Sequence, residues 1–413
     1  MPPAELPPFA PAARMRIAPA RRAAAPRRHS LARQVARNPV LVCWGLFVFA
    51  IPFYVFESGL PQPGDMLVFL LVPAALLVRD RRLDRSTRAI LRALWWFTLW
   101  VTLVNYGWAL VSWKFDRLKD FVIHPVFYLF NAVLLYSAVV IAKRDREAFL
   151  RVTVYVVYVS VFLQFAATFI TARSYRTDGF FNNSNRLGYY ALLAACIFAL
   201  AQRPLGIKRW LTGAGITCCA YLAVLSASRS ALAGIAILLF TLMFANPRTI
   251  ILASLAALAV TSLGGPLSEA IDHAEERSQT LSRQGTFSEE RGYDRIWKNP
   301  EYLLTGAGEG GYERFAHPGE HARELHSSFG SVLFAYGVVG AALFGVFLVR
   351  MFRGTSLRDK AILAAGLSFA LAHQGLRFTM FWVVLIVFVV LKQLAAAQVK
   401  PKPLAATAPP SRA

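Results

Sequence analysis

The sequence predicts an all-α polytopic membrane protein with about 12 transmembrane helices and one large extracytoplasmic loop. Of its 413 residues, 56% are hydrophobic and only 16% are charged, whereas about a quarter are charged in a typical soluble domain. Apolar segments recur along the chain, and basic residues concentrate in alternate loops. This composition excludes a disordered chain, a collagen and a disulfide-stapled secreted domain.

Apolar segments follow one another along most of the chain, separated by short polar stretches. A helix that spans a membrane needs roughly 20 mostly apolar residues. Several segments are shorter than this, and the second contains Pro73. The expected spans are 39–56, 65–78, 89–112, 121–142, 150–170, 187–202, 209–226, 230–246, 248–265, 327–350, 359–376 and 378–396.

The basic residues predict how these helices are oriented. If the N-terminus is cytoplasmic, most Lys and Arg residues fall in cytoplasmic tails and loops, whereas the external loops hold about as many acidic as basic residues. This asymmetry follows the positive-inside rule, so both termini are predicted to be cytoplasmic. The formal net charge of +22 is therefore a signal of topology, and no nucleic-acid partner is expected.

The same assignment divides the chain into domains. We expect transmembrane helices at 39–265 and 326–396, with the external loop 266–325 between them. The Pro-, Ala- and Arg-rich tail 1–38 is predicted to be disordered near acidic lipid headgroups, and 397–413 forms a second cytoplasmic tail. The four cysteines all fall in spans, so the external loop has no disulfide framework.

Polar side chains beside the membrane are costly unless they have a partner or a function, and two external arginines stand out. Asn185 is a candidate N-cap for the helix near 187, which places Arg186 in the first turn. A cation there opposes the helix dipole but gains from a bound anion. Arg229 lies in a tight turn of small residues. The alternative for both is a guanidinium group that only snorkels to the interface.

The external loop contributes two more arginines. Arg291 and Arg295 are four residues apart, so they share a face if this segment is helical. The alternative is a set of weak surface ion pairs with neighbouring acidic residues. The glycines at 306–311 lack the strand–turn–helix frame that a nucleotide-binding loop requires.

A histidine lies where the loop returns to the membrane. His326, followed by Ser327, opens the tenth span, and histidine is the side chain best suited to move a proton near neutral pH. The alternative is an interfacial histidine bonded to a loop carbonyl. His317 and His321 do not predict zinc, because an intervening Pro-Gly pair prevents them from sharing a helix face.

These residues together favour a substrate that carries a diphosphate. Arginine binds phosphate through two parallel hydrogen bonds and stays charged when partly buried, so it can take the place of a metal ion. No ATP is expected outside the cytoplasm, so the substrate must arrive already activated. Transfer of a sugar from a polyprenyl diphosphate fits these conditions.

The sequence resembles the bacterial O-antigen ligases, within the superfamily that also contains O-antigen polymerases and O-oligosaccharyltransferases. The pattern His326-Ser327, nine residues, Gly337, two residues, Gly340 is similar to the ligase pattern His-[Asn/Ser/Gln]-x9-Gly-x-x-[Gly/Thr/Tyr]. It follows the large external loop, as in the family. The resemblance extends from about residue 179 to 345, and the first five spans match only in number and hydrophobicity.

The resemblance implies a C-type glycosyltransferase fold with a helical periplasmic loop in the bacterial inner membrane. It implies an inverting transfer of O-antigen polysaccharide from undecaprenyl diphosphate to lipid A–core, in lipopolysaccharide biosynthesis, without a metal or nucleotide cofactor. His326 would deprotonate the acceptor hydroxyl. Arg186, Arg229 and Arg291 would hold the diphosphate, with Arg295 as the second loop candidate and Asn185 and Ser327 in support.

Two alternatives stay open. An O-antigen polymerase or a protein O-oligosaccharyltransferase would use the same donor with another acceptor. A transporter with twelve helices would place its substrate near the midplane between two repeats. Against transport, the single long loop makes the halves unequal, and the polar residues gather at the external face.

Overall fold

The computed structural model describes most of the apolar part of the chain. The predicted span 248–265, most of the external loop with His317 and His321, and most of both tails lie outside the described residues. The described residues are 31, 35, 38–56, 60–78, 81–111, 118–171, 177–245, 288, 291–315 and 324–399.

The described part of the chain is helical and contains no β-strand. The principal helices, in chain order, are α2 (Pro39–Ala50), α3 (Pro63–Met66), α4 (Val68–Leu76), α5 (Arg85–Val111), α6 (Leu118–Ala142), α7 (Arg146–Thr171), α8 (Ser184–Leu205), α9 (Arg209–Leu225), α10 (Arg229–Ala245), α14 (Asp294–Lys298), α15 (Ser328–Phe352), α16 (Leu357–Ser368) and α17 (Thr379–Val399). Short 3₁₀ turns follow α14 and separate α16 from α17.

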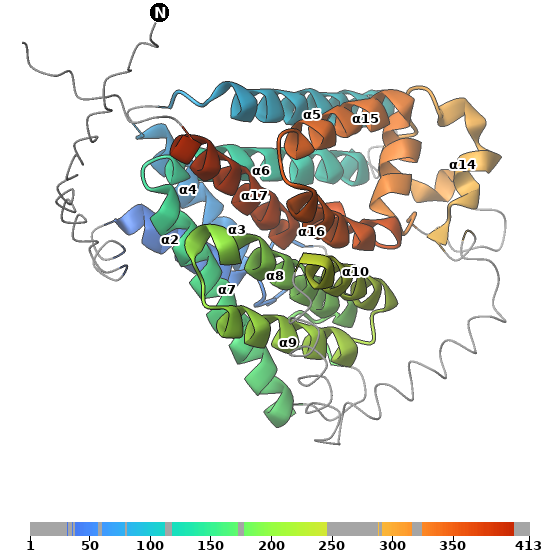
Figure 1. The fold of residues 1–413 in the computed structure, drawn as a ribbon. Helices are drawn as coiled ribbons and strands as arrows, with labels where there is room; N and C mark the ends of the chain where they lie inside the picture. Colours follow the sequence, from blue (N-terminus) through green and yellow to red (C-terminus); the bar gives the residue numbers. More distant parts are fainter. Residues whose placement is uncertain are drawn as a thin grey trace, which may run out of the picture.

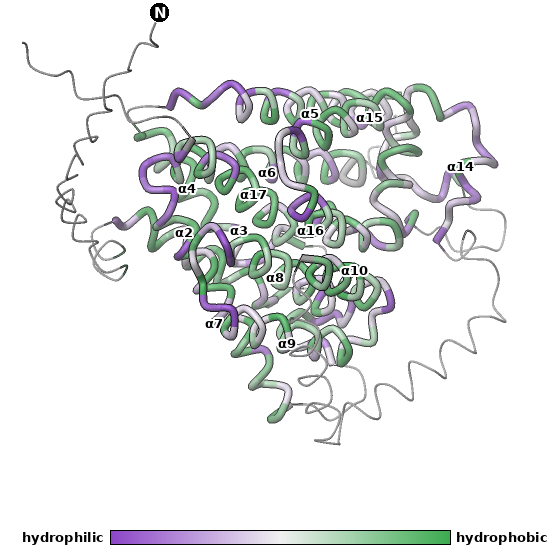
Figure 2. The backbone as a smooth tube through the Cα atoms, in the orientation of Figure 1, coloured by the Kyte–Doolittle hydropathy of each residue, from purple (hydrophilic) through white to green (hydrophobic). Residues whose placement is uncertain are grey.

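Six of these helices, namely α5, α6, α7, α8, α15 and α17, are long and apolar enough to cross a membrane. The helices α2, α9 and α10 are apolar but shorter. Hydrophobic residues cover most of the helix lengths, and hydrophilic residues gather toward helix ends and around α14 (Figure 2). These features indicate a membrane-embedded helical protein.

The helices lie alongside one another, with α14 beyond one end of the bundle (Figure 1). We call this end the α14 end. Here the chain leaves α5, α9 and α16 and enters α8, α10, α15 and α17. At the opposite end, the side chain of Gln393 near the end of α17 bonds to Thr87 at the start of α5 and to Arg146 at the start of α7. Segments distant in sequence are therefore fixed together at both ends.

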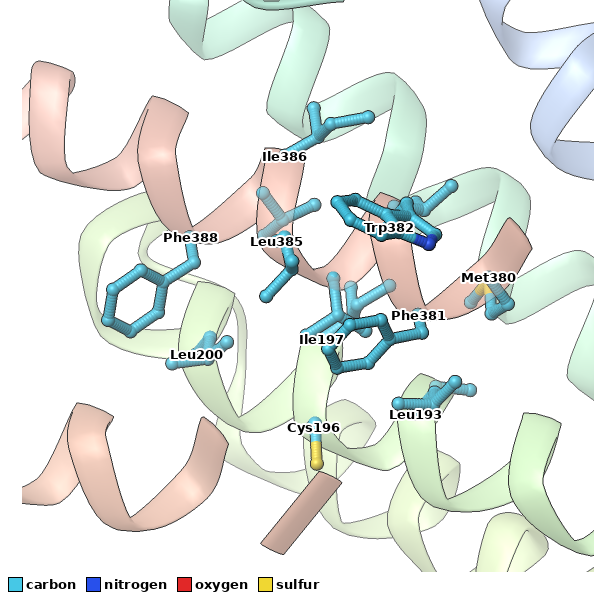
Figure 3. Packing of buried hydrophobic residues seen from close by; sticks show 14 of the residues in the cluster. Leu193, Cys196, Ile197, Leu200, Met380, Phe381, Trp382, Leu385, Ile386 and Phe388 are labelled. Carbon is cyan, nitrogen blue, oxygen red and sulfur yellow. The ribbon is translucent and has the colours of Figure 1, made fainter. Parts of the chain in front are cut away.

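The helices α8 and α17 form the centre of the core. Every residue of α8 from Leu187 to Ala201 is buried, as is the run from Met380 to Val390 in α17. Their side chains interlock, with Phe381, Leu385 and Phe388 among the residues that lie close to Leu193, Ile197 and Leu200 (Figure 3). A helix that is apolar on all sides belongs in the interior of a bundle, as here.

Three predicted spans are shorter or broken. The helix expected at 39–56 ends at Ala50, because Pro52 lacks the N–H that a further turn requires. The span 65–78 is two short helices, α3 and α4. The prediction of a continuous helix over 359–376 was wrong in its second half, because α16 ends at Ser368 and is followed by 3₁₀ turns. All four cysteines are free, and they lie in α2, α8 and α9.

Candidate functional site

A non-helical segment between α16 and α17 lies at the α14 end and contains three polar residues, His373, Gln374 and Arg377. We call residues 369–378 the connector; it contains the 3₁₀ turns η4 (Phe369–Leu371) and η5 (Gly375–Arg377). Sequence reasoning placed it in two spans because apolar residues surround His373, Gln374 and Arg377. Several of the predicted site residues contact this segment.

The start of α15 is bonded to the connector through two serines. Ser327 is the N-cap of α15, and its Oγ accepts from Gly330 N at 3.0 Å and donates to Ala370 O at 3.2 Å. Ser328 N donates to His373 O at 3.1 Å, and Leu376 N donates to Ser328 Oγ at 3.0 Å. These bonds satisfy backbone groups that a helix end leaves open. Ser327 is thus a structural anchor of the site.

His326 lies immediately before this anchored cap. Its backbone N donates to Arg291 O at 3.0 Å, and its side chain is exposed. A backbone bond therefore fixes the position of this exposed residue beside the cap of α15. This arrangement leaves the ring accessible for chemistry at the surface of the α14 end.

The two loop arginines have different surroundings, and the unbroken helix that would place them on one face is not present. Gly292, with φ +74°, interrupts the helix between them, so α14 begins only at Asp294. The Arg291 guanidinium donates to Ala372 O of the connector at 2.9 Å. The Arg295 guanidinium lies 5.6 Å from the centre of the Phe315 ring. Only Arg291 is thereby placed on the connector beside His326.

The N-cap of α8 is Asn183, so the assignment of Asn185 as the cap was wrong. Asn183 has extended backbone angles, and its side chain accepts from Asn185 N and Arg186 N. Asn185 is therefore in the first turn, together with Arg186. An asparagine two residues earlier than expected satisfies the free N–H groups.

Arg186 reaches from α8 to the connector. Its guanidinium donates to Tyr54 Oη at 2.7 Å and lies 5.7 Å from the centre of the Phe378 ring. Burial raises the pKa of Tyr54, and the adjacent Arg186 offsets only part of this effect. Tyr54 is consequently a neutral acceptor, and the half-buried Asp65 is an acidic group that interacts with Arg186.

Arg229 lies on the neighbouring turn. It is exposed at the first position of α10. The turn before it packs on the start of α8, where a Cβ on Gly188 would lie 3.0 Å from the Cβ atoms of Ser228 and Ala231. The glycine thus brings this turn within van der Waals contact of α8. Arg229 therefore lies beside the first turn of α8, which contains Arg186.

A buried ion cluster beneath the loop was missed by sequence reasoning. We use this name for Glu309, Glu324 and Arg377. The Arg377 guanidinium of the connector contacts Glu309 at 2.8 Å and Glu324 at 2.5 Å, and only 2% of the Glu309 side chain is exposed. Burial lowers the pKa of Arg377, but the two carboxylates outweigh it and raise that pKa well above its usual value. The cluster joins the loop to the connector.

Two helices supply further partners to Glu309. Tyr128 Oη of α6 donates to its carboxylate at 3.2 Å, and His124 Nδ1 lies 3.5 Å from it. Asn105 of α5 accepts from Glu309 N at 3.0 Å. In the sequence, Glu309 is the acidic residue of a glycine-rich segment and Arg377 is an arginine in a mostly apolar stretch. Neither feature shows that the two residues form a pair, which becomes visible only in the folded structure.

The glycines of the ligase-like pattern have a packing role. Gly337 interrupts α15 with φ +67°, and Val338 N donates to Leu303 O at 2.7 Å. A Cβ on Gly337 would lie against the carbonyl group of Leu304 and 2.8 Å from Gly306 N. The glycine run 306–311 also bonds to α15, with Gly308 N donating to Ala335 O at 2.8 Å. This glycine-rich segment is a packing loop in the structure.

Replacing Gly337 by alanine should destabilise the protein. Gly337, with φ +67° and ψ −174°, lies in a region essentially restricted to glycine that costs an L-residue about 1–3 kcal/mol, and the contact with the 304–306 backbone adds to this. Gly345→Ala is the matched control, because a Cβ there meets nothing within 4 Å. Thermal unfolding in detergent should show a lower Tm for Gly337→Ala and no loss for Gly345→Ala. Equal Tm values would contradict the packing role.

The structure thus places Arg186 and Arg291 against the connector and His326 beside Arg291, with Arg229 on the turn next to α8 and Arg295 over Phe315. Among the described residues, no group of three His, Cys, Asp or Glu side chains lies in position to hold a metal ion. Comparison with models of known protein families and with curated protein sequences finds no match to this chain.

Proposed function

We propose that the protein is a glycosyltransferase of the O-antigen ligase type, which moves polysaccharide from undecaprenyl diphosphate to lipid A–core at the periplasmic face. The observation that carries the proposal is that Arg186 and Arg291 both contact the connector, with His326 bonded through its backbone to Arg291, at one end of an apolar helix bundle. Cations and a titratable base thereby lie beside apolar helices, where a lipid-linked anion has access.

The arginines suit the leaving group. During transfer, negative charge accumulates on the departing diphosphate, so fixed cations at that position stabilise the transition state more than the ground state. Arg186 lies in the first turn of α8, at the positive end of the helix dipole, which also favours an anion. We assign Arg186 and Arg291 to the diphosphate, with Arg229 at its edge and Arg295 in support of the loop.

His326 is assigned as the general base. It removes the proton from the acceptor hydroxyl as the oxygen attacks the anomeric carbon, and the bond between that carbon and the diphosphate breaks. The diphosphate leaves with the bonding electron pair, and attack from the opposite face inverts the anomeric configuration. The exposed ring of His326 beside the anchored cap suits this role.

The proposal includes the topology. About twelve helices in a C-type arrangement would place both termini in the cytoplasm of a bacterial inner membrane and the α14 end in the periplasm. The alternation of helix ends between the α14 end and the opposite end is compatible with this orientation.

Donor binding tests the arginine assignment. Arg186→Gln and Arg291→Gln should each weaken binding of undecaprenyl diphosphate about 10- to 100-fold, because each removes charge-assisted hydrogen bonds to phosphate. Arg353→Gln, an exposed arginine at the opposite end, should bind as the unmodified protein does. Titration of the purified proteins in detergent measures the three affinities. If the first two variants bound the donor as tightly as the unmodified protein, neither arginine would bind the diphosphate, and both would only place their charged groups at the membrane interface.

A further inference from the structure

A basic groove lies at the opposite end of the bundle from the candidate site. It has a volume of about 860 Å³ and is bounded by the segment before α5, the first turns of α5 and one residue of α6. Arg81, Arg82, Arg88 and Arg92 line it. Among the described residues that line the groove, none is acidic, so its electrostatic potential is positive.

The groove has a charged end and an apolar end. Arg88, Arg92, Trp95 and Leu99 are spaced by three or four residues, so they form one stripe along α5. The stripe starts near the helix terminus and extends about 16 Å, at 1.5 Å per residue, toward the bundle centre. The two arginines therefore lie nearer the membrane surface, and the apolar side chains lie nearer the hydrocarbon.

The apolar end faces outward from the bundle. Trp96 is 57% exposed and Leu99 is 46% exposed, and Tyr136 of α6 closes the other side of the groove. In a membrane these side chains contact acyl chains, and tryptophan is enriched where the hydrocarbon meets the headgroups. Arg92 is about one turn inside the predicted span 89–112, where an arginine needs an anionic partner or a path to the surface.

We propose that this groove binds an anionic phospholipid, with the phosphate-bearing headgroup between Arg88 and Arg92 and an acyl chain along Trp95, Trp96 and Leu99. Arg88 and Arg92 are opposite in charge to a phosphate, and arginine binds phosphate through two parallel hydrogen bonds. A soluble anion would leave the apolar end uncovered. The terminal tails are poor occupants, because both are basic and the only acidic residue in 1–38 is Glu5.

The test is lipid binding by the full-length protein, measured by native mass spectrometry in detergent with phosphatidylglycerol as the probe. Arg88→Gln and Arg92→Gln should each weaken the tightest phosphatidylglycerol site about fivefold, and the double variant about 25-fold, because each arginine near an anionic headgroup contributes a factor of this size. Arg85→Gln is the matched control, since Arg85 begins the same helix but does not line the groove. Its affinity should equal that of the unmodified protein.

Two further measurements distinguish an anionic lipid from a neutral lipid and from free phosphate as the ligand. Phosphatidylcholine, which has no net charge, should bind at least tenfold more weakly than phosphatidylglycerol. Inorganic phosphate at millimolar concentration should not displace the bound lipid. The proposal is overturned if the double variant binds phosphatidylglycerol as tightly as the unmodified protein, if phosphatidylcholine binds equally well, or if phosphate displaces the lipid. None of these readouts depends on glycan transfer.

Discussion

Replacing His326 by alanine should lower the rate of glycan transfer by about 100- to 10,000-fold, the contribution typical of a positioned general base. The protein should still fold, because the bond from His326 N to Arg291 O involves only the backbone and the side chain is exposed. The measurement is transfer from lipid-linked polysaccharide to lipid A–core by the purified variant in detergent. Unchanged size-exclusion and thermal unfolding profiles would confirm the fold.

His373 is the comparison residue for this experiment. It lies in the connector, where its ring stacks on Phe369 with the ring centres 4.7 Å apart. His373→Ala should therefore affect stability more than the chemical step. Normal transfer by His326→Ala would contradict the assignment of His326 as base. Loss of transfer in His373→Ala alone would move that role to the connector.

Replacing Arg377 by methionine should cost about 3–5 kcal/mol of stability, the range for breaking a buried ion pair. The substitution leaves Glu309, with 2% of its side chain exposed, without the guanidinium that lies 2.8 Å away. An ion pair at the surface is expected to contribute far less to stability. Lys298 forms an ion pair with Asp294, and its side chain is 58% exposed. Lys298→Met should therefore change the free energy of unfolding by under about 1 kcal/mol.

A double variant isolates the cause of this loss. Glu309→Gln removes the charge that Arg377→Met leaves uncompensated, so the double variant should be more stable than Arg377→Met alone. Thermal unfolding in detergent measures all four proteins. If Arg377→Met unfolds at the temperature of the unmodified protein, the ion cluster does not fix the loop to the connector.

The sequence predicted the helical spans where apolar residues run without interruption. It located α5, α6, α7, α8, α15 and α17 to within a few residues of most of their ends, because each combines sufficient length with polar flanking residues. It failed at the connector, since hydropathy averaged over a window conceals polar residues such as His373 and Arg377 within an apolar stretch. It also placed the α8 cap two residues too late, because Asn183 and Asn185 both suit that position.

The sequence predicted which types of residue form the candidate site, but it did not predict which of these residues contact one another. Arginines and a histidine at the external boundary were recognisable as costly groups that needed a role. The pairing of Arg377 with Glu309 joins positions 68 residues apart, and no local pattern indicates it. The packing role of Gly337 similarly depends on Leu304, which only the fold brings against α15.

The most direct test of the central claim is reconstitution of the transfer itself. Purified protein in detergent is incubated with undecaprenyl-diphosphate-linked polysaccharide and lipid A–core, and the lipid A product is analysed by gel electrophoresis and mass spectrometry. We predict lipid A–core that carries the polysaccharide, with release of undecaprenyl diphosphate. Unmodified lipid A–core would contradict the account; lengthened lipid-linked glycan would instead indicate a polymerase, and substrate uptake in proteoliposomes without a product would indicate a transporter.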